Sequence, residues 1–387
     1  MIAMFAWHRF LAVLIKEFVQ MRRDRLTFAM MIGVPIMQLV LFGYAINSDP
    51  KRLPTAVVSA EASPFARSFV RALENTDYYR VVAQPRTVDE ADRLIATGQV
   101  QFVIHVPEDF SRGIQRGDRP VLLVEADASD PAATGPAVSA LTALNLHALD
   151  NDLTGGLAVQ KAGPPAFEVR VHRRYNPEGI TQYNIVPGLM GVVLTMTMIM
   201  MTSIAMTRER ERGTMENLLA TPVSPFEVML GKIVPYILVG YVQVAVILLA
   251  AKFLFQIPMV GSLVLLTAVV VLFIAANLAI GFTFSTVAKS QMQAMQMTMF
   301  FFLPSILLSG FMFPFRGMPV CAQWLGEIFP LTHVLRIVRG ILLKGSTASE
   351  ILPSVWPLAL ILAVVSIAAM RRYNRTCLLY TSPSPRD

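Results

Sequence analysis

The side chains most able to support catalysis or metal binding are few and scattered along this chain of 387 residues. The two cysteines, Cys321 and Cys377, show neither a CxxC pair nor a Cys/His spacing, so they indicate no metal site and no disulfide framework. The histidines lack the spacing that places two ligands on one helix face; they are His8, His105, His147, His172 and His333. We therefore expect structural or solvated roles for these side chains.

Two aspartates in the segment EADASDP, Asp127 and Asp130, are the remaining candidates for metal ligands. Asp130 stands directly before Pro131 at the start of a helical pattern, which favours a helix N-cap over a ligand. The region around them has no GxSxG, HExxH or glycine-rich phosphate motif, so we expect it to bind or gate rather than to catalyse. The whole chain also lacks a GxxxxGK[ST] loop, because Gly231-Lys232 is followed by isoleucine.

A dense run of alternating charge is the strongest candidate for a functional contact. Residues 207–223 read TRERERGTMENLLATPV and follow a long stretch without charge. Charges this dense mark a membrane interface, because they are costly in hydrocarbon. Between Gly213 and Pro222 only about two helical turns fit, and so short a helix is marginal in water without a partner surface. The alternative is a solvated loop whose charges only anchor the topology.

Polar residues inside apolar stretches are the candidates for a transport path; they are Gln243, Asn277, Gln293 and Gln296. Such amides also join membrane helices to one another, and this alternative stays open. No acidic or basic residue lies convincingly in the middle of a stretch. The sequence therefore shows no buried proton relay.

The composition explains where these residues must sit. The chain is 54% hydrophobic and 15% charged, with a mean hydropathy of +0.54, which is typical of an integral membrane protein. The formal charge of +7 could suggest nucleic acid, but the basic residues gather beside apolar stretches, as the positive-inside rule describes. We expect no nucleic-acid partner.

The apolar stretches predict a polytopic α-helical membrane protein with six transmembrane helices and an extracytoplasmic α/β domain between the first two. The expected transmembrane helices are residues 26–46, 184–206, 224–255, 260–287, 291–313 and 351–370. The other expected segments are a cytoplasmic amphipathic interfacial helix at 1–25, the α/β domain at 47–183, the charged region at 207–223, short outer-leaflet helices at 314–350 and a cytoplasmic tail at 371–387. Within the tail, residues 377–387 resemble an artefactual read-through.

Basic residues flanking these stretches predict that both termini lie in the cytoplasm. We expect a multi-pass protein of the inner, cytoplasmic membrane. The segment from Phe315 to Glu350 weakens this pattern, because it carries Arg316, Arg336, Arg339 and Lys344 on what must be the outer side.

Within 47–183 strand-like and helix-like patterns alternate, which predicts an α/β domain with a mixed or parallel sheet. The expected strands are LPTAVVSA, YYRVVAQ, VQFVIHV, PVLLVEAD and FEVRVHR. A long helix is expected through AVSALTALNLHALDNDL, residues 137–153.

Several motifs resemble the permease subunits of ABC-2 type transporters, in the drug and daunorubicin-type exporter group with a large outer domain. The most specific are ERERGTMENLLATPVSP and FPLTHVLRIVRGILLKG, with NIVPGLMGVVLTM and LSGFMFPFRGMP between or before them in the expected order. The resemblance covers the chain up to about Arg375.

The resemblance implies that Gly213–Ala220 is a coupling helix that docks on a separate ATP-binding subunit. The residues implied at this contact are Glu209, Glu211, Gly213, Thr214, Glu216, Leu218, Leu219 and Pro222. It further implies a second permease copy or close paralogue, and an outer mouth closed by the segment 314–350, where the gate candidates are Glu327, His333, Arg336 and Arg339. This chain would bind no cofactor, since ATP and magnesium belong to the partner.

We therefore expect a transport subunit that exports an amphipathic or drug-like compound, with a periplasmic adaptor as a further partner. The rival interpretation is a membrane receptor or envelope scaffold whose α/β domain binds a ligand or protein. A receptor would need a cytoplasmic output domain, and the chain has only short loops there.

Overall fold

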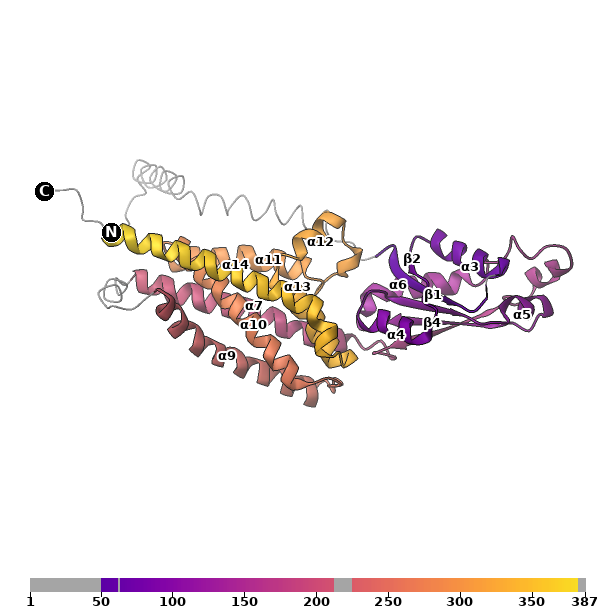
Figure 1. Cartoon of the computed structure of the whole chain (residues 1–387), viewed down its shortest axis with the longest axis horizontal. Coiled ribbons are helices and arrows are strands. Elements are labelled where there is room, and N and C mark those ends of the chain that lie inside the picture. Colours follow the sequence, from indigo (N-terminus) through magenta and orange to yellow (C-terminus); the bar gives the residue numbers. More distant parts are fainter. Residues whose placement is uncertain (1–49, 62, 212–224, 382–387) are drawn as a thin grey trace, which may run out of the picture.

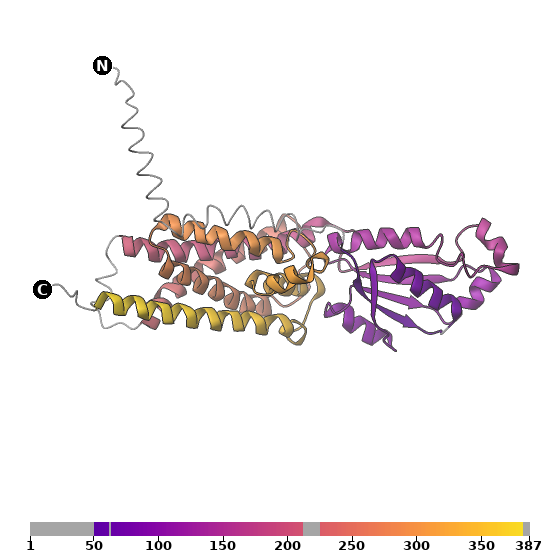
Figure 2. The ribbon, with the colours of Figure 1, turned by 90° about the horizontal axis from the view of Figure 1, so that it is seen from above.

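A computed structural model of the chain describes residues 50–61, 63–211 and 225–381. The expected interfacial helix at 1–25, the first expected transmembrane helix at 26–46 and residues 212–223 of the charged region lie outside the described residues. The described part is elongated, with a helical bundle at one end and a sheet covered by helices at the other (Figures 1 and 2).

The α/β domain, Leu53–Arg174, contains a five-stranded sheet in the order β2-β1-β3-β4-β5. Neighbouring strands are parallel except for the antiparallel pair β3 and β4, so the sheet is mixed, one of the two arrangements that the sequence left open. Its elements are β1 (Leu53–Ser59), α3 (Pro64–Asn75), β2 (Tyr79–Ala83), α4 (Val88–Ala96), β3 (Phe102–Val106), α5 (Phe110–Arg116), β4 (Val121–Asp127), α6 (Pro131–Leu144), the 3-10 helix η2 (Gly155–Ala162) and β5 (Glu168–Arg174).

Alternation along the strands decides which helices cover which face of the sheet. Phe102 and Ile104 of β3 join Leu122 of β4 in an apolar core that includes residues of α3, α5 and α6. The opposite face packs against α4, where Val103 contacts the cluster formed by Ala91 and Ile95. Helix α4 covers only part of that face.

A charged network covers the same face over β4 and β5. Glu125 is only 5% exposed, and its carboxylate accepts hydrogen bonds from Arg174 at 2.8 and 3.0 Å and from His105 at 3.2 Å. Burial alone would raise the pKa of Glu125, but these bonds outweigh it and hold the pKa below its ordinary value. Arg174 also pairs with Asp92 at 2.6 Å. The partners of Glu125 all come from the sheet itself.

Helix α6 differs from the long helix expected at 137–153, which was wrong at both ends. It begins at Pro131 and ends at Leu144, and turns follow. Asn145, His147 and Asp150 lie directly beyond it, and short polar side chains of this kind compete with helical hydrogen bonds. The turns also bring Leu149 into the core of the domain.

The expected N-cap at Asp130 is right in position and wrong in contact. Asp130 precedes the first residue of α6, but its side chain makes no capping hydrogen bond. The Asp130 Oδ1 atom accepts instead from the side-chain amide of Asn184, at 3.1 Å.

The helical bundle follows the α/β domain in the chain, and the described residues after β5 contain no further strand. Its elements are α7 (Thr181–Glu211), α9 (Pro225–Phe253), α10 (Leu263–Val287), α11 (Gln291–Leu308), the 3-10 helix η3 (Phe315–Gly317), α12 (Val320–Gly326), α13 (Pro330–Arg339), the π-helical turn η4 (Gly340–Lys344) and α14 (Ala348–Thr381). In the described residues, four helices are long and apolar enough to cross a membrane, namely α7, α9, α10 and α14. Six transmembrane helices therefore remain a prediction.

Helix α11 packs along α7 but ends at Leu308, five residues before the expected end at 313. The chain leaves the helix through Gly310, whose φ of +85° favours glycine and stops a right-handed helix.

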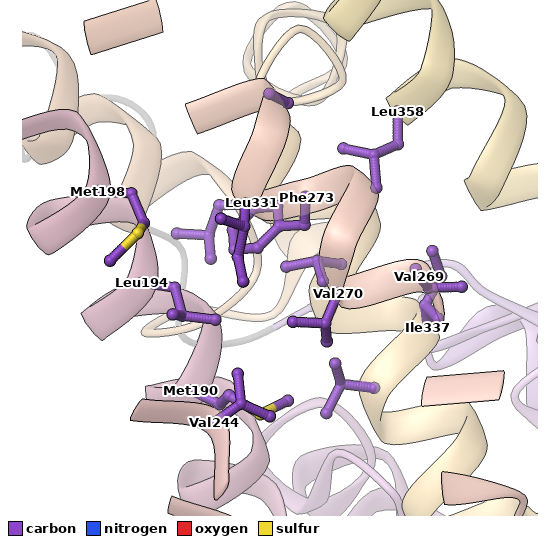
Figure 3. Close-up of a cluster of buried hydrophobic side chains, with 14 of the residues drawn as sticks. Met190, Leu194, Met198, Val244, Val269, Val270, Phe273, Leu331, Ile337 and Leu358 are labelled. Carbon is purple, nitrogen blue, oxygen red and sulfur yellow. The ribbon is translucent and has the colours of Figure 1, made fainter. Parts of the chain in front are cut away.

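The core of the bundle lies around α10, which packs against α7 and α14 (Figure 3). Phe273 and Val270 of α10 meet Leu194 of α7 and Leu358 of α14 there. In their most apolar parts, 56% of α7 and of α10 is buried, against 17% of α9 and 11% of α14. The outer faces of α9 and α14 are therefore apolar and open to lipid or to another protein.

The π-helical turn η4 contacts the loop between α9 and α10. The backbone amide of Val260, in the α9–α10 loop, donates to the carbonyl of Leu342 at 3.1 Å. Gly261 next to it lies against the backbone of Ile341, with no room for a side chain. Lys344 is the last residue of the turn, and Gly345 follows it as the C-cap with a φ of +71°.

Gly281 permits a close approach of α10 to α7. A Cβ atom on Gly281 would lie 2.6 Å from the carbonyl oxygen of Ile199, and main-chain atoms cannot rotate away. Gly281→Ala is expected to cost about 1–3 kcal/mol through overpacking, seen as a lower midpoint of thermal unfolding in detergent.

Gly135→Ala is the matched control for this prediction, because Gly135 is also helical but has open space around its Cβ position. It should leave the midpoint unchanged or raise it slightly, since alanine has the higher helix propensity. Equal midpoints for the two variants would contradict the close contact at Gly281.

Candidate functional site

The first group of expected functional residues lies at the end of the bundle away from the α/β domain, where α7 ends and α11 begins. Glu209 is partly buried and Glu211 is exposed at the end of α7. The Glu211 carboxylate accepts a hydrogen bond from the backbone amide of Gln291 at 2.8 Å and another from the Gln291 side chain at 2.5 Å. The other expected coupling residues, Gly213, Thr214, Glu216, Leu218, Leu219 and Pro222, lie outside the described residues.

The Glu211 contact satisfies one of the backbone amides that every helix leaves free at its first turn. Ser290 satisfies another, because its hydroxyl accepts from the Gln293 amide at 3.3 Å. The hydrogen bonds from Gln291 lower the pKa of Glu211, so its charge is stabilised at the positive end of α11. The charged region is thus tied to α11 as well as to α7.

The expected transport-path residues lie on three helices, α9, α10 and α11, and the described bond of Gln243 is the one that reaches a neighbouring helix. Thr197 of α7 donates to the Gln243 side-chain oxygen of α9 at 3.0 Å. Asn277 of α10 is fully buried and donates to the carbonyl of Phe273 at 3.0 Å, while its own side-chain oxygen has no described partner. The Gln293 side chain accepts from the Lys289 amide at 2.9 Å.

Gln296 of α11 has a buried side-chain oxygen without a described partner. Two residues further along α11, Thr298 meets Ser203 of α7 with 3.2 Å between their hydroxyl oxygens. The described polar groups therefore join α7 to α9 and to α11.

Three of the four expected gate residues form one cluster. Arg336 of α13 binds Glu327 with two hydrogen bonds, at 2.6 and 3.2 Å, and stacks 4.5 Å from the centre of the Phe315 ring. The His333 ring is 2% exposed, and its Nε2 lies 2.8 Å from the backbone oxygen of Glu327. Arg339 does not belong to this cluster, because its guanidinium donates to the carbonyl of Gly310 at 3.2 Å.

The α/β domain meets the bundle through polar contacts, which we call the outer junction: Asp127 and Asp130 on one side and Arg316, Arg339 and Lys344 on the other. The Lys344 ammonium forms an ion pair with Asp127, and the two side chains are only 10% and 8% exposed. The same ammonium lies 3.4 Å from the carbonyl oxygen of Ile95.

Arg316 adds a second link at the outer junction, because its guanidinium donates to the carbonyl of Gly98 at 2.5 Å. Asn184, in the first turn of α7, adds a third through Asp130. Lys344 lies 217 positions from Asp127 in the chain, and Arg316 lies 218 positions from Gly98.

Two adjoining cavities lie at the outer junction. The smaller has a volume of about 210 Å³ and is lined by residues that include Asp127, Ser129, Arg339 and Lys344. The larger, about 490 Å³, is lined by residues that include Phe315, Glu327 and Pro353. Both are bordered by Asp130, Arg316 and Arg336, so they adjoin one another.

Sequence reasoning missed the outer junction, although two of its signals were visible. Asp127 was considered as a metal ligand, but the described residues contain no group of three or more His, Cys, Asp or Glu side chains suited to a metal ion. Arg316 and Lys344 stood out only as positive charges on the unexpected side. Their partners could not be named because they lie in a different domain.

The model of the family described as "ABC-2 family transporter protein" matches residues 25–371. The chain is 28% identical to the "Probable multidrug ABC transporter permease YbhS" of Escherichia coli (strain K12) over 347 residues, 88% of this chain and 90% of that protein. It is 27% identical to the "Probable multidrug ABC transporter permease YbhR" of the same organism over 369 residues, 95% of this chain and 99% of that protein.

The chain is also 29% identical to the "Inner membrane transport permease YhhJ" of Escherichia coli (strain K12) over 84% of this chain and 85% of that protein. A crystal structure of a domain of a putative ABC type-2 transporter from Thermotoga maritima MSB8 is similar to 31% of this chain and 84% of that one. Its TM-score is 0.27 at 21% identity, too low to support a statement about the fold.

Lys344→Ala is expected to lower the free energy of unfolding by about 3 kcal/mol, because Asp127 would remain buried without its cation. The matched control is Arg52→Ala, which breaks an ion pair with Asp77 whose side chains are 73% and 56% exposed, and which should change stability little. Thermal unfolding of the purified chain measures both. A Lys344→Ala protein as stable as Arg52→Ala would contradict a buried link at the outer junction.

Glu211→Ala is expected to speed hydrogen exchange at the first amides of α11, because the amide of Gln291 loses its acceptor. Mass spectrometry of peptides covering 288–295 measures the rate. Glu178→Ala removes an exposed carboxylate for which no described partner exists, and it should leave these peptides unchanged. Unchanged exchange in Glu211→Ala would show that the contact does not hold the start of α11.

Proposed function

We propose, from the premise that this chain belongs to the ABC-2 family of transporter proteins, that it forms the translocation path of an exporter driven by a separate ATP-binding subunit. One observation carries the proposal: the family model covers residues 25–371, which include both the α/β domain and the bundle. The chain is a membrane permease and a transport subunit, as are the relatives that align with most of its length. ATP and magnesium would bind to the partner.

We propose an amphipathic or drug-like compound as the substrate. Two relatives carry the name of multidrug permeases, which supports this class without identifying a compound. The candidate path residues Gln243, Asn277, Gln293 and Gln296 lie in helices that pack against one another, and two of them have buried side-chain oxygens without a hydrogen-bond partner among the described residues. Such free acceptors would be available to a passing donor when the helices separate.

The proposed topology has six transmembrane helices in the inner membrane, both termini in the cytoplasm and the α/β domain outside. The two ends of the described molecule support it: the α/β domain occupies one end of the bundle, and the charged end of α7 lies at the other (Figure 1). The apolar outer faces of α9 and α14 suit lipid or a second permease copy. A periplasmic adaptor would dock on the α/β domain.

Coupling to the ATP-binding subunit is proposed for the segment Gly213–Ala220, with Glu209 and Glu211 beside it. The link between Glu211 and Gln291 supports a specific route, because force applied to the charged region would reach α11 as well as α7. The receptor or scaffold interpretation is not favoured, because the matching family and the relatives are transport proteins.

The test is to purify the chain with the candidate ATP-binding subunit and to compare co-purification and ATP turnover in native protein and in Glu209→Ala with Glu211→Ala. Loss of either property in a folded permease is expected. Gln291→Ala is the matched control, because it disturbs the α7–α11 link and leaves both carboxylates in place.

The control separates two roles of Glu211. If Gln291→Ala reduces turnover without reducing co-purification, Glu211 acts by transmitting motion into α11. If only the double carboxylate variant loses co-purification, the carboxylates contact the partner directly. A native chain that binds no ATP-binding subunit and alters no turnover would overturn the proposed function.

A further inference from the structure

The cations that border the cavities of the outer junction differ in whether they have a carboxylate partner. Lys344 is paired with Asp127, and Arg336 is paired with Glu327. Arg316 and Arg339 form no ion pair with any described residue, and their described hydrogen bonds go to the backbone oxygens of Gly98 and Gly310. Two guanidinium groups thus border the smaller cavity with nitrogen donors that no described residue accepts from.

Arg339 is the less satisfied of the two. Its Nε and one terminal nitrogen, Nη2, are buried and have no hydrogen-bond partner in the described part of the chain. A buried charged donor without an acceptor keeps the full cost of leaving water, so native proteins usually supply an acceptor, an ion or an ordered water. These two nitrogens are therefore available to donate to an acceptor that is not part of the described chain.

Space for such an acceptor lies next to both arginines. The smaller cavity is bordered by Arg316 and Arg339, and its volume of about 210 Å³ holds far more than one water, whose share of liquid is about 30 Å³. It is also bordered by Ser129 and Gln101 from the α/β domain. Hydroxyl and amide groups can donate to an anion as well.

The position of the cavity favours an anion found at a membrane surface. Ile351 and Ser354, in the first turns of the long apolar helix α14, border it. Phe315 and Pro314 border the larger adjoining cavity, which supplies an apolar wall beside the charged one. A phosphate group with an attached apolar body would meet both surfaces there.

The carboxylates near the arginines do not cancel this preference. Asp127 is neutralised by Lys344, and the Glu350 carboxylate accepts from the Thr347 amide at 2.8 Å. Burial raises the pKa of Asp130, although the charge of Arg339 opposes this, so Asp130 takes up a proton more readily than an ordinary aspartate. Among the described groups that border the cavities, Arg316 and Arg339 are therefore the cations that form no ion pair with a carboxylate.

We propose that the cavities of the outer junction bind a phosphate group held by Arg316 and Arg339. The planar fork of a guanidinium matches two phosphate oxygens at once, which a lysine does not reproduce. The phosphate is either that of a membrane phospholipid or a free anion. A bound phosphate bridges α13 and η3 to the α/β domain and completes the polar links of the outer junction.

The first arm of the test adds inorganic phosphate to the purified full-length chain in detergent and follows the midpoint of thermal unfolding, with chloride at equal ionic strength as the reference. Phosphate is expected to raise the midpoint of the native chain. Arg316→Gln and Arg339→Gln should each weaken the apparent affinity by about 10- to 100-fold, since a charge-assisted hydrogen-bonding group is lost.

The second arm identifies the source. Native mass spectra are recorded after purification from membranes, and the midpoint is compared in nanodiscs of phosphatidylglycerol and of a galactolipid without phosphate. A phospholipid retained by native protein and lost in Arg339→Gln, with stabilisation only in phosphatidylglycerol, assigns the site to a lipid. Stabilisation by inorganic phosphate in both nanodiscs assigns it to a free anion.

Controls keep the proposal falsifiable if a variant is unstable. Arg52→Gln removes an exposed arginine directly before β1 and should respond to phosphate like the native chain. Arg339→Lys keeps the charge without the fork and should bind with intermediate affinity. If the native chain shows no response to phosphate and retains no phospholipid, the free nitrogens of Arg339 are satisfied by water and the proposal is overturned. Both arms read binding, so they do not depend on an ATP-binding partner.

Discussion

The ion pair between Lys344 and Asp127 is the interaction on which the joining of the two halves depends. Each half has its own apolar core, one around α10 and one under the five-stranded sheet, and no described apolar cluster spans both. The halves meet instead through a buried ammonium and carboxylate, an arginine on a backbone carbonyl and an asparagine on an aspartate. Because polar links are directional, they fix an orientation, whereas an apolar interface of the same size would tolerate sliding.

Much of the fold could be predicted from periodicity, because periodicity reports local geometry. The strands at Leu53–Ser59 and Val121–Asp127 follow from alternating apolar residues, and the helix at Pro64–Asn75 follows from its spacing and from Ser63, whose hydroxyl accepts the Ala66 amide. The end of α6 was missed because Leu149 is drawn into the core by tertiary packing. The expected span at 291–313 was too long because apolar residues continue past a glycine that turns the chain.

The candidate sites were harder to predict, because they depend on partners far away in sequence. Arg316 and Lys344 were visible as misplaced positive charges, yet nothing in their own segment names Gly98 or Asp127 as their partners. Glu211 was expected to face a partner protein, and the structure shows that its carboxylate also holds the start of α11. Gln243 was expected to line a path, and its described bond is to a neighbouring helix. In each case the residue type indicated that the position matters, but the contacts of the side chain in the fold determine what it does.

The π-helical turn between α13 and α14 makes the spacing of this segment as important as its residues. A π turn contains one residue more per hydrogen-bonded loop than an α turn, and here it ends at Lys344. A chain shorter by one residue between Gly340 and Lys344 could close as an ordinary α-helix. The ammonium group would then begin about 100° around the helix axis and about 1.5 Å back along it. An insertion or deletion in this turn would therefore shift the Lys344 ammonium relative to Asp127, even when every charged residue is kept.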